Sequence, residues 1–231
     1  MHKKMKILTL AAAFIFCSIG IWAGDTATFV DLGFSPDGNT YIFAQYGVRS
    51  TNLRPWADMF IVDVQSNNFV PQGRLNYIHN SAITAGQDGQ GALHRLIADN
   101  ASVIERHNVN FNIQGKPLFL ALDHGNQADT IDFRDFENNI TYRAALVYSI
   151  QGQGEALRSS FFINLESIDR NGYRRTYTVG TPQLWRPMIE SYRIRQVIVN
   201  PQNTSMILVI EMRQREGESV NIRFMVEAVR L

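Results

Sequence analysis

The stretch from Gly33 to Ala44 constrains the fold of this chain more than any other. Its centre, Ser35-Pro36-Asp37-Gly38, has the composition of a type I turn, in which proline presets φ at the second position and the closing glycine accepts a positive φ. Tyr41 to Ala44 follow as strand-forming residues. A second strand, Asp58 to Val64, ends at another turn signal, so the stretch predicts an antiparallel strand pair.

A similar phrase occurs near the C-terminus. The run Val199 to Val209 aligns without a gap with Phe34 to Ala44, and Pro201 takes the place of Pro36. Asn203 replaces Gly38, and asparagine is the residue that best substitutes for glycine at positive φ. The match predicts two copies of one β unit. The alternative, that proline-containing turns of this kind recur without repetition, stays open.

One region between these units has helical periodicity. The apolar residues with the spacing of a single helix face are Leu93, Leu96, Ile97, Ala101 and Ile104. A weaker helix is predicted before it, from Leu75, Ile78, Ala82 and Ile83. Asp88 is the expected cap of the main helix.

The chain from Phe111 onward reads as short strands separated by turns. Asn171-Gly172 predicts a hairpin with a type I′ turn, and Tyr173, Arg175, Tyr177 and Val179 alternate on its return strand. We therefore predict a mainly β fold of antiparallel, propeller-like or sandwich sheets, with a helical insertion at about residues 72–107.

The first 23 residues have the pattern of a Sec-type signal peptide. A basic start with Lys3, Lys4 and Lys6 precedes an apolar run, and Ala23 offers a small residue for cleavage. The run is shorter than the ~20 residues that a spanning helix needs. We predict a signal peptide at 1–23, one mainly β domain at 24–231, a periplasmic or secreted protein and no membrane span after cleavage. An uncleaved anchor and lipidation at Cys17 are the alternatives.

Removal of this segment changes the composition in two ways that limit function. The remaining chain has 19 basic and 21 acidic side chains, a net charge of −2, so no basic excess is available for nucleic acid. Cys17 is the only cysteine, so the exported chain has neither a disulfide nor a thiol nucleophile.

No group of residues has the spacing of a catalytic, cofactor or metal site. Asp129, Asp132, Asp135 and Glu137 form the densest acidic cluster, but they lack the spacing of known calcium loops, and a solvated surface is the favoured interpretation. The histidines His79, His94, His107 and His124 form no close ligand pair. Trp56 and Trp185 stand beside prolines. Each is either a loop residue that anchors a partner or a residue that closes an edge of the core. We assign no catalytic, cofactor or metal residues and no binding residues.

Two resemblances to known proteins rest on stretches of this sequence. The phrase Phe34-Ser35-Pro36-Asp37-Gly38, with the strand Met59 to Val64 after it, resembles a blade unit of TolB-type propellers. The mature chain as a whole is similar to a family of bacterial predicted secreted proteins of unknown function. That similarity rests on the runs Leu32 to Gly38, Phe43 to Val48, Met59 to Val64, Asn67 to Pro71 and Val199 to Pro201. It implies an exported protein and supplies no catalytic residues.

Two functions remain as hypotheses. The favoured one is a non-enzymatic binding or assembly module whose partner is a protein or glycan of the cell envelope, without a cofactor. The alternative is a hydrolase of envelope polysaccharide or peptide, with Asp123, Asp129 or Asp132 as acid and base.

Overall fold

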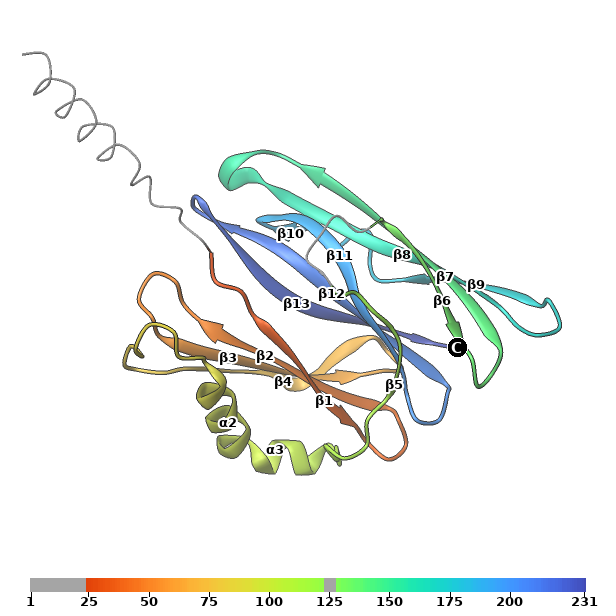
Figure 1. The fold of residues 1–231 in the computed structure, drawn as a ribbon, viewed down its shortest axis with the longest axis horizontal. Helices are drawn as coiled ribbons and strands as arrows, with labels where there is room; N and C mark the ends of the chain where they lie inside the picture. Colours follow the sequence, from red (N-terminus) through yellow and green to blue (C-terminus); the bar gives the residue numbers. More distant parts are fainter. Residues whose placement is uncertain (1–23, 123–127) are drawn as a thin grey trace, which may run out of the picture.

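A computed structural model describes residues 24–122 and 128–231 of the protein, which form three antiparallel β-sheets and two short α-helices (Figure 1). The predicted mainly β class is confirmed. The predicted signal peptide at 1–23, with Cys17, lies outside the described residues, as do Asp123 and His124.

The first sheet, here called the N-terminal sheet, is a meander in which each strand pairs with the next along the chain. Its strands alternate between two buried faces. Tyr41 and Phe43 point into one apolar core, whereas Ile42 and Ala44 point into another. This alternation follows from the two-residue period of side chains along a strand. The strands are β1 (Thr28–Phe34), β2 (Thr40–Val48), β3 (Pro55–Asp63) and β4 (Asn68–Ile78).

The middle-chain sheet follows the helices and holds five strands in the order β10-β8-β7-β6, with β9 also paired to β8. A short 3-10 turn, η1 (Gly154–Ala156), joins its two longest strands. The strands are β6 (Thr130–Asp135), β7 (Ile140–Gln151), β8 (Arg158–Ile168), β9 (Arg174–Val179) and β10 (Arg186–Pro187).

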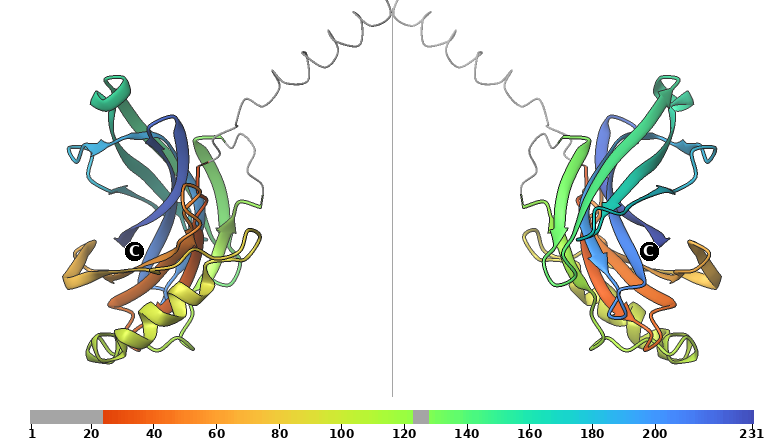
Figure 2. Two further views of the ribbon diagram at one scale, coloured as in Figure 1. Left: turned by 90° about the vertical axis from the view of Figure 1, so that its left-hand side faces the viewer. Right: turned by 90° about the vertical axis from the view of Figure 1, so that its right-hand side faces the viewer.

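The central sheet lies between the other two (Figures 1 and 2). Its strand β12 is apolar on both faces: Met206 and Leu208 pack against the middle-chain sheet, while Ile207 and Val209 pack against the N-terminal sheet. The result is a stack of sheets with a sandwich-like core on each side of the central one. The strands, in spatial order, are β13 (Ser219–Arg230), β12 (Ser205–Glu216), β11 (Ile189–Val199) and β5 (Lys116–Leu120).

The helices α2 (Gln90–Asp99) and α3 (Ala101–Arg106) cover the outer face of the N-terminal sheet (Figure 2). Leu93, Leu96 and Ile104 are buried there, as the periodicity predicts. Ala101 is exposed instead, because the helix breaks at Asn100, whose φ of −118° is not helical, and the periodicity restarts after it. Asp88 does not occupy the N-cap position, which is Gly89, although its carboxylate accepts a hydrogen bond from the Gln90 amide at 3.0 Å.

The predicted helical insertion at 72–107 is too long at its start, and the weaker helix predicted there is wrong. Residues 72–78 belong to β4, where Leu75 pairs with Met59 and Tyr77 pairs with Ala57 on β3. The three-residue spacing of Leu75 and Ile78 resembles a helix face. Pairing with a neighbouring strand decides the structure, because a strand beside a sheet satisfies its backbone hydrogen bonds there.

The two similar turns have the same backbone hydrogen bonds. The Gly38 amide donates to the Ser35 carbonyl at 2.9 Å, and the Asn203 amide donates to the Asn200 carbonyl at 2.9 Å. Gly38 and Asn203 have positive φ values of 71° and 56°, as predicted. Tyr41 and Met206, each three residues after these positions, then point toward the next sheet of the stack. The likeness of the first unit to a TolB propeller blade stays a prediction.

The hairpin at Asn171-Gly172 forms, but the type I′ prediction is wrong. Of the two residues only Gly172 has a positive φ, at 78°. The carboxylate of Asp169 accepts hydrogen bonds from the amides of Asn171 and Tyr173, at 2.8 and 2.9 Å. An aspartate that holds the turn in this way stabilises a different backbone path from the one that Asn-Gly alone favours.

Candidate ligand-binding site

A hollow lined by aromatic side chains lies where the turns β6–β7, β8–β9 and β11–β12 come together, beside the C-terminal Leu231. Its volume is about 580 Å³. We call it the tyrosine hollow. The side chains that give it its chemistry are Tyr142, Tyr173, Tyr177, Arg170, Arg175, Asp135, Asn138, Asn171 and Asn203.

Strand β9 and the turn before it form one side of the hollow. Side chains that alternate along β9 and the residue before it share one face of the β8–β9 hairpin. They are Val179, Tyr177, Arg175 and Tyr173. Val179 lies in the core with an exposed fraction of 2%, whereas Tyr173 is 62% exposed. The same face that is core at one end is therefore open at the other, and it presents rings and a guanidinium to solvent.

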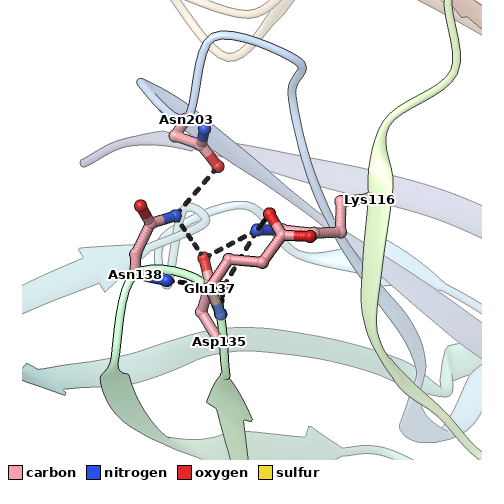
Figure 3. A network of polar contacts seen from close by, with 5 residues as sticks. All are labelled: Lys116, Asp135, Glu137, Asn138 and Asn203. Carbon is pink, nitrogen blue, oxygen red and sulfur yellow. Dashed lines mark hydrogen bonds and ion pairs between the residues drawn. The ribbon is translucent and has the colours of Figure 1, made fainter.

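A network of polar contacts forms one wall of the hollow (Figure 3). The ammonium of Lys116, from β5, contacts the Asp135 carboxylate at 2.9 and 3.0 Å and the Glu137 carboxylate at 2.8 Å. The side-chain amide of Asn138 donates to Asp135 at 2.7 Å and to Asn203 at 3.3 Å. The network joins the central sheet to the middle-chain sheet and fixes the turns that border the hollow.

Asp135 is held as a carboxylate by this network. Its burial acts to raise the pKa, but the hydrogen bonds from Asn138 and Lys116 outweigh burial, so the pKa lies below its usual value. Lys116 is affected in the complementary sense: burial acts to lower its pKa, and its contacts with Glu137 and Asp135 raise it above the usual value. Near neutral pH both groups are charged, so Asp135 is an acceptor in this wall and not a proton donor.

Tyr142 forms the buried side of the hollow. Its ring stacks on Phe133 with centroids 5.3 Å apart and planes 13° from parallel. Burial, together with the charges of Asp135 and Tyr177, raises the pKa of Tyr142 to about 12, while Arg175 opposes this change. The hydroxyl is therefore protonated at physiological pH and available as a hydrogen-bond donor or acceptor.

The arrangement suits a ligand rich in hydroxyl groups. Rings offer flat apolar contact, and the surrounding amides, carboxylate and guanidinium offer donors and acceptors at the edges. The parts of the chain that the structure describes contain no group of three histidine, cysteine, aspartate or glutamate residues placed to share a metal ion. The lining of the hollow therefore suits contact with a polar organic molecule.

The acidic cluster seen in the sequence is divided by the strand that carries it. Asp132 and Asp135 lie three residues apart on β6 and point to opposite faces. Asp132 pairs with Arg143 on the exposed face at 2.8 Å, while Asp135 joins Lys116. Asp129 is exposed ahead of the strand, and its carbonyl accepts a hydrogen bond from the Leu146 amide. A shared calcium site is not formed by these residues.

The described histidines are scattered over the molecule. His79 lies after β4, where its Nδ1 is 3.1 Å from the Tyr77 hydroxyl. His94 is exposed on α2, and His107 ends α3. None of the three lines the tyrosine hollow.

The two tryptophans next to prolines differ from each other. Trp56 is not on a loop: it lies within β3, is buried, and donates its indole hydrogen to Asp25 at 2.9 Å. Trp185 is half-buried just before β10, with the guanidinium of Arg158 5.3 Å from its ring centroid. Trp56 therefore belongs to the core, and neither residue lines the tyrosine hollow.

Sequence reasoning missed the tyrosine hollow, although one signal was visible. The alternation of Tyr173, Arg175 and Tyr177 marks a strand face with rings and a charge where a core face has aliphatic side chains. The contribution of Asp135, Asn138 and Asn203 depends on three turns that are far apart in sequence.

Within the described ranges, no helix is both long and apolar enough to span a bilayer. No curated protein and no solved structure is significantly similar to the chain. A family model with the description "Predicted secreted protein (DUF2259)" matches residues 42–230, which include most strands of all three sheets and both helices. The chain belongs to this family of predicted secreted proteins.

Proposed function

We propose that the protein is an exported, non-catalytic binding module of the cell envelope, and that the tyrosine hollow holds a segment of a glycan. The observation that carries the proposal is the open end of the β9 face, where Tyr173, Arg175 and Tyr177 meet the polar wall at Asp135 and Asn138. Sugar rings stack on aromatic faces, and their hydroxyls exchange hydrogen bonds with amides and carboxylates.

The rigidity of the site supports binding in preference to turnover. Asp135 is fixed by Lys116 and Asn138, and Tyr142 is fixed by Phe133. A hollow whose polar groups are already oriented loses little freedom when a ligand binds. The hydrolase alternative has less support among the described residues, since Asp132 is paired with Arg143 outside the hollow and Asp129 does not line it.

Binding is tested by titrating the purified protein with soluble peptidoglycan fragments and chitotetraose, with dextran fragments for comparison. Tyr173→Ala removes an exposed ring and is expected to weaken binding about tenfold, in the range of a single aromatic contact. The matched control is Tyr148→Ala, because Tyr148 is also an exposed tyrosine of the same sheet but lies outside the hollow. Equal affinity of wild type and Tyr173→Ala would contradict the proposal.

The same samples distinguish binding from hydrolysis. A binding module leaves the concentration of reducing ends unchanged over hours, whereas a hydrolase raises it. Asp129→Asn and Asp132→Asn should change neither the affinity for the glycan nor the concentration of reducing ends. If the wild type releases reducing ends and either variant does not, the hydrolase is favoured.

We propose that a Sec-type signal peptide at residues 1–23 directs export to the periplasm or the exterior and is then cleaved. The family to which the chain belongs supports export. N-terminal sequencing of the protein from a periplasmic fraction and from the medium identifies both the compartment and the cleaved bond. A membrane-bound protein that begins at its first residue would contradict cleavage.

A further inference from the structure

A second hollow, with a different chemistry, lies at the other end of β12. It is bordered by the residues that follow β2 and by the β12–β13 turn, and its volume is about 420 Å³. None of the residues that line it lines the tyrosine hollow. The residues used below are Asp25, Arg49, Ser50, Glu216, Glu218 and Arg223.

The inner side of this hollow is a buried ion pair with its own partners. Asp25 and Arg223 are 2.8 Å apart, and their side chains are 5% and 18% exposed. Asp25 also accepts the indole hydrogen of Trp56, over whose ring the Arg223 guanidinium lies at 4.4 Å. These two charges compensate each other and are fixed in place, so they form a preorganised base for the hollow.

The charges on the outer walls form no close ion pair among the described residues, although the charge of Arg49 also acts on the buried carboxylate of Asp58. Arg49 and Glu218 make no hydrogen bond or ion pair through their side chains with any part of the described chain. Glu216 accepts a hydrogen bond from the Asn221 amide at 2.7 Å and takes part in no ion pair among those residues. A guanidinium outside any close ion pair with the described residues thus stands on the β2 side, and two carboxylates stand on the β12–β13 turn.

We propose that this hollow binds a zwitterion: a short peptide or amino acid with both a free ammonium and a free carboxylate. The ligand carboxylate pairs with Arg49 and accepts a hydrogen bond from Ser50, while the ammonium lies between Glu216 and Glu218. Guanidinium groups bind carboxylates in a planar, two-bond geometry, and carboxylates are the natural acceptors of an ammonium. A simple anion would meet Glu216 and Glu218, and a simple cation would meet Arg49, so only a ligand with both charges is matched on both walls.

The experiment uses glycylglycine as the probe, with N-acetylglycylglycine and glycylglycinamide as analogues that lack one charge each. Binding to the purified exported protein is followed by NMR shifts of backbone amides. We expect millimolar binding of glycylglycine and about tenfold weaker binding of each blocked analogue, the usual size of a lost charged hydrogen bond.

Two variants test which wall of the hollow binds which charge of the ligand. Arg49→Gln should weaken glycylglycine about tenfold but leave the affinity for glycylglycinamide unchanged, because that analogue has no carboxylate to lose. Glu218→Gln should weaken glycylglycine and glycylglycinamide alike and leave N-acetylglycylglycine unchanged. The controls Arg106→Gln and Glu105→Gln change the same residue types on the exposed end of α3 and should have no effect.

The proposal is overturned if glycylglycine at ~10 mM shifts no amide near the hollow, since this concentration would occupy most of a millimolar site. It is also overturned if the blocked analogues bind as well as glycylglycine, or if Arg49→Gln binds like the wild type. Failure of glycan binding at the tyrosine hollow would leave the proposal intact, because the two sites share no residue.

Discussion

Gly38 is the residue at which the two similar turns touch. A Cβ at this position would overlap with the side-chain ends of Asn200 and Gln202, which belong to the other turn. Gln202 is held there by a hydrogen bond to the Pro36 carbonyl at 2.6 Å. Glycine therefore meets two requirements here, a positive φ and a close approach between turns.

These two requirements are separated by a pair of substitutions. Gly172 has a similar φ of 78°, but nothing lies within 4 Å of the place where its Cβ would be. Gly172→Ala should cost about 1–2 kcal/mol through backbone strain alone. Gly38→Ala should cost about 1 kcal/mol more, because the neighbouring turn must also shift. Urea unfolding measures both, and equal costs would show that the contact between the turns adds nothing.

Asn203→Gly provides the comparison at the second turn. Glycine relieves the strain of a positive φ, and the substitution removes the 3.3 Å hydrogen bond from Asn138. We expect a change within about 0.5 kcal/mol in the same unfolding experiment.

Asp58 makes stability depend on pH in the opposite sense to an ordinary paired carboxylate. Burial raises its pKa above the usual 3.8, although the hydrogen bond from Gln45 and the charges of Arg223 and Arg49 oppose this. Between 3.8 and the raised value the folded protein holds this proton more tightly than the unfolded chain does. The contribution of Asp58 to stability is therefore fully present below 3.8 and is lost as pH rises through the folded pKa.

Asp58→Asn should consequently raise the urea midpoint at pH 7, because the amide still accepts from Gln45 and carries no charge to bury. The advantage should vanish at pH 3, where the aspartate is neutral as well. Asp99→Asn serves as the control, since Asp99 is an exposed partner of Arg95. A variant less stable than wild type at pH 7 would show that the attraction of the arginines outweighs the cost of burial.

At the level of elements, the helices stabilise the molecule by covering a sheet face. Leu96 is 2% exposed between α2 and the N-terminal sheet. Leu96→Ala should reduce the free energy of unfolding by about 2–4 kcal/mol, the range for a large core side chain. Arg95→Ala, one residue earlier and on the solvent side, should change it by less than about 0.5 kcal/mol. Thermal or urea unfolding followed by circular dichroism compares the two, and a small loss for Leu96→Ala would mean that the helices are dispensable.

The elements that could be predicted from the sequence are those with local signals. The turn at Ser35 to Gly38 and the strands around it follow from residue types that permit few other conformations. Strand β4 could not be predicted, because Leu75 and Ile78 fit a helix until the pairing with β3 is known. The turn at Asn171 departs from the type I′ geometry that Asn-Gly predicts, because Asp169, two residues earlier, controls its backbone.

The candidate sites were harder to predict than the strands. Each hollow is made by loops from distant parts of the chain: residues 25, 49 and 216 in one case, and residues 135, 173 and 203 in the other. Neither set contains a motif of fixed spacing. Only the alternation of Tyr173, Arg175 and Tyr177 is a local signal, and the turns that face these residues come from other segments of the chain.

On the scale of the whole molecule, the central sheet links both cores and should make unfolding cooperative. The strand β12 contributes Leu208 to one core and Val209 to the other, so neither core can open without exposing the same strand. Trp56 lies in the N-terminal sheet and Trp185 lies beside the middle-chain sheet. Each tryptophan therefore reports on one flank of the stack.

The prediction is that both flanks unfold together. In a Trp22→Phe background, Trp185→Phe leaves Trp56 as the fluorophore and Trp56→Phe leaves Trp185. Within each variant, the fluorescence and circular dichroism transitions in urea should coincide, as two-state unfolding requires. A fluorescence change that precedes the loss of strand signal in one variant would show that its flank opens separately.

The order of the sheets along the chain has a consequence for biogenesis. Three of the four strands of the central sheet, β11 to β13, span Ile189 to Arg230 and follow the strands of both flanking sheets in the sequence. Synthesis from the N-terminus therefore produces the two flanking sheets first, each with an apolar surface still lacking its counterpart. Burial of those surfaces is therefore postponed until the final segment arrives. A chain that stops near residue 188 leaves both surfaces exposed to solvent, and exposed apolar surface makes a partly folded chain prone to aggregate.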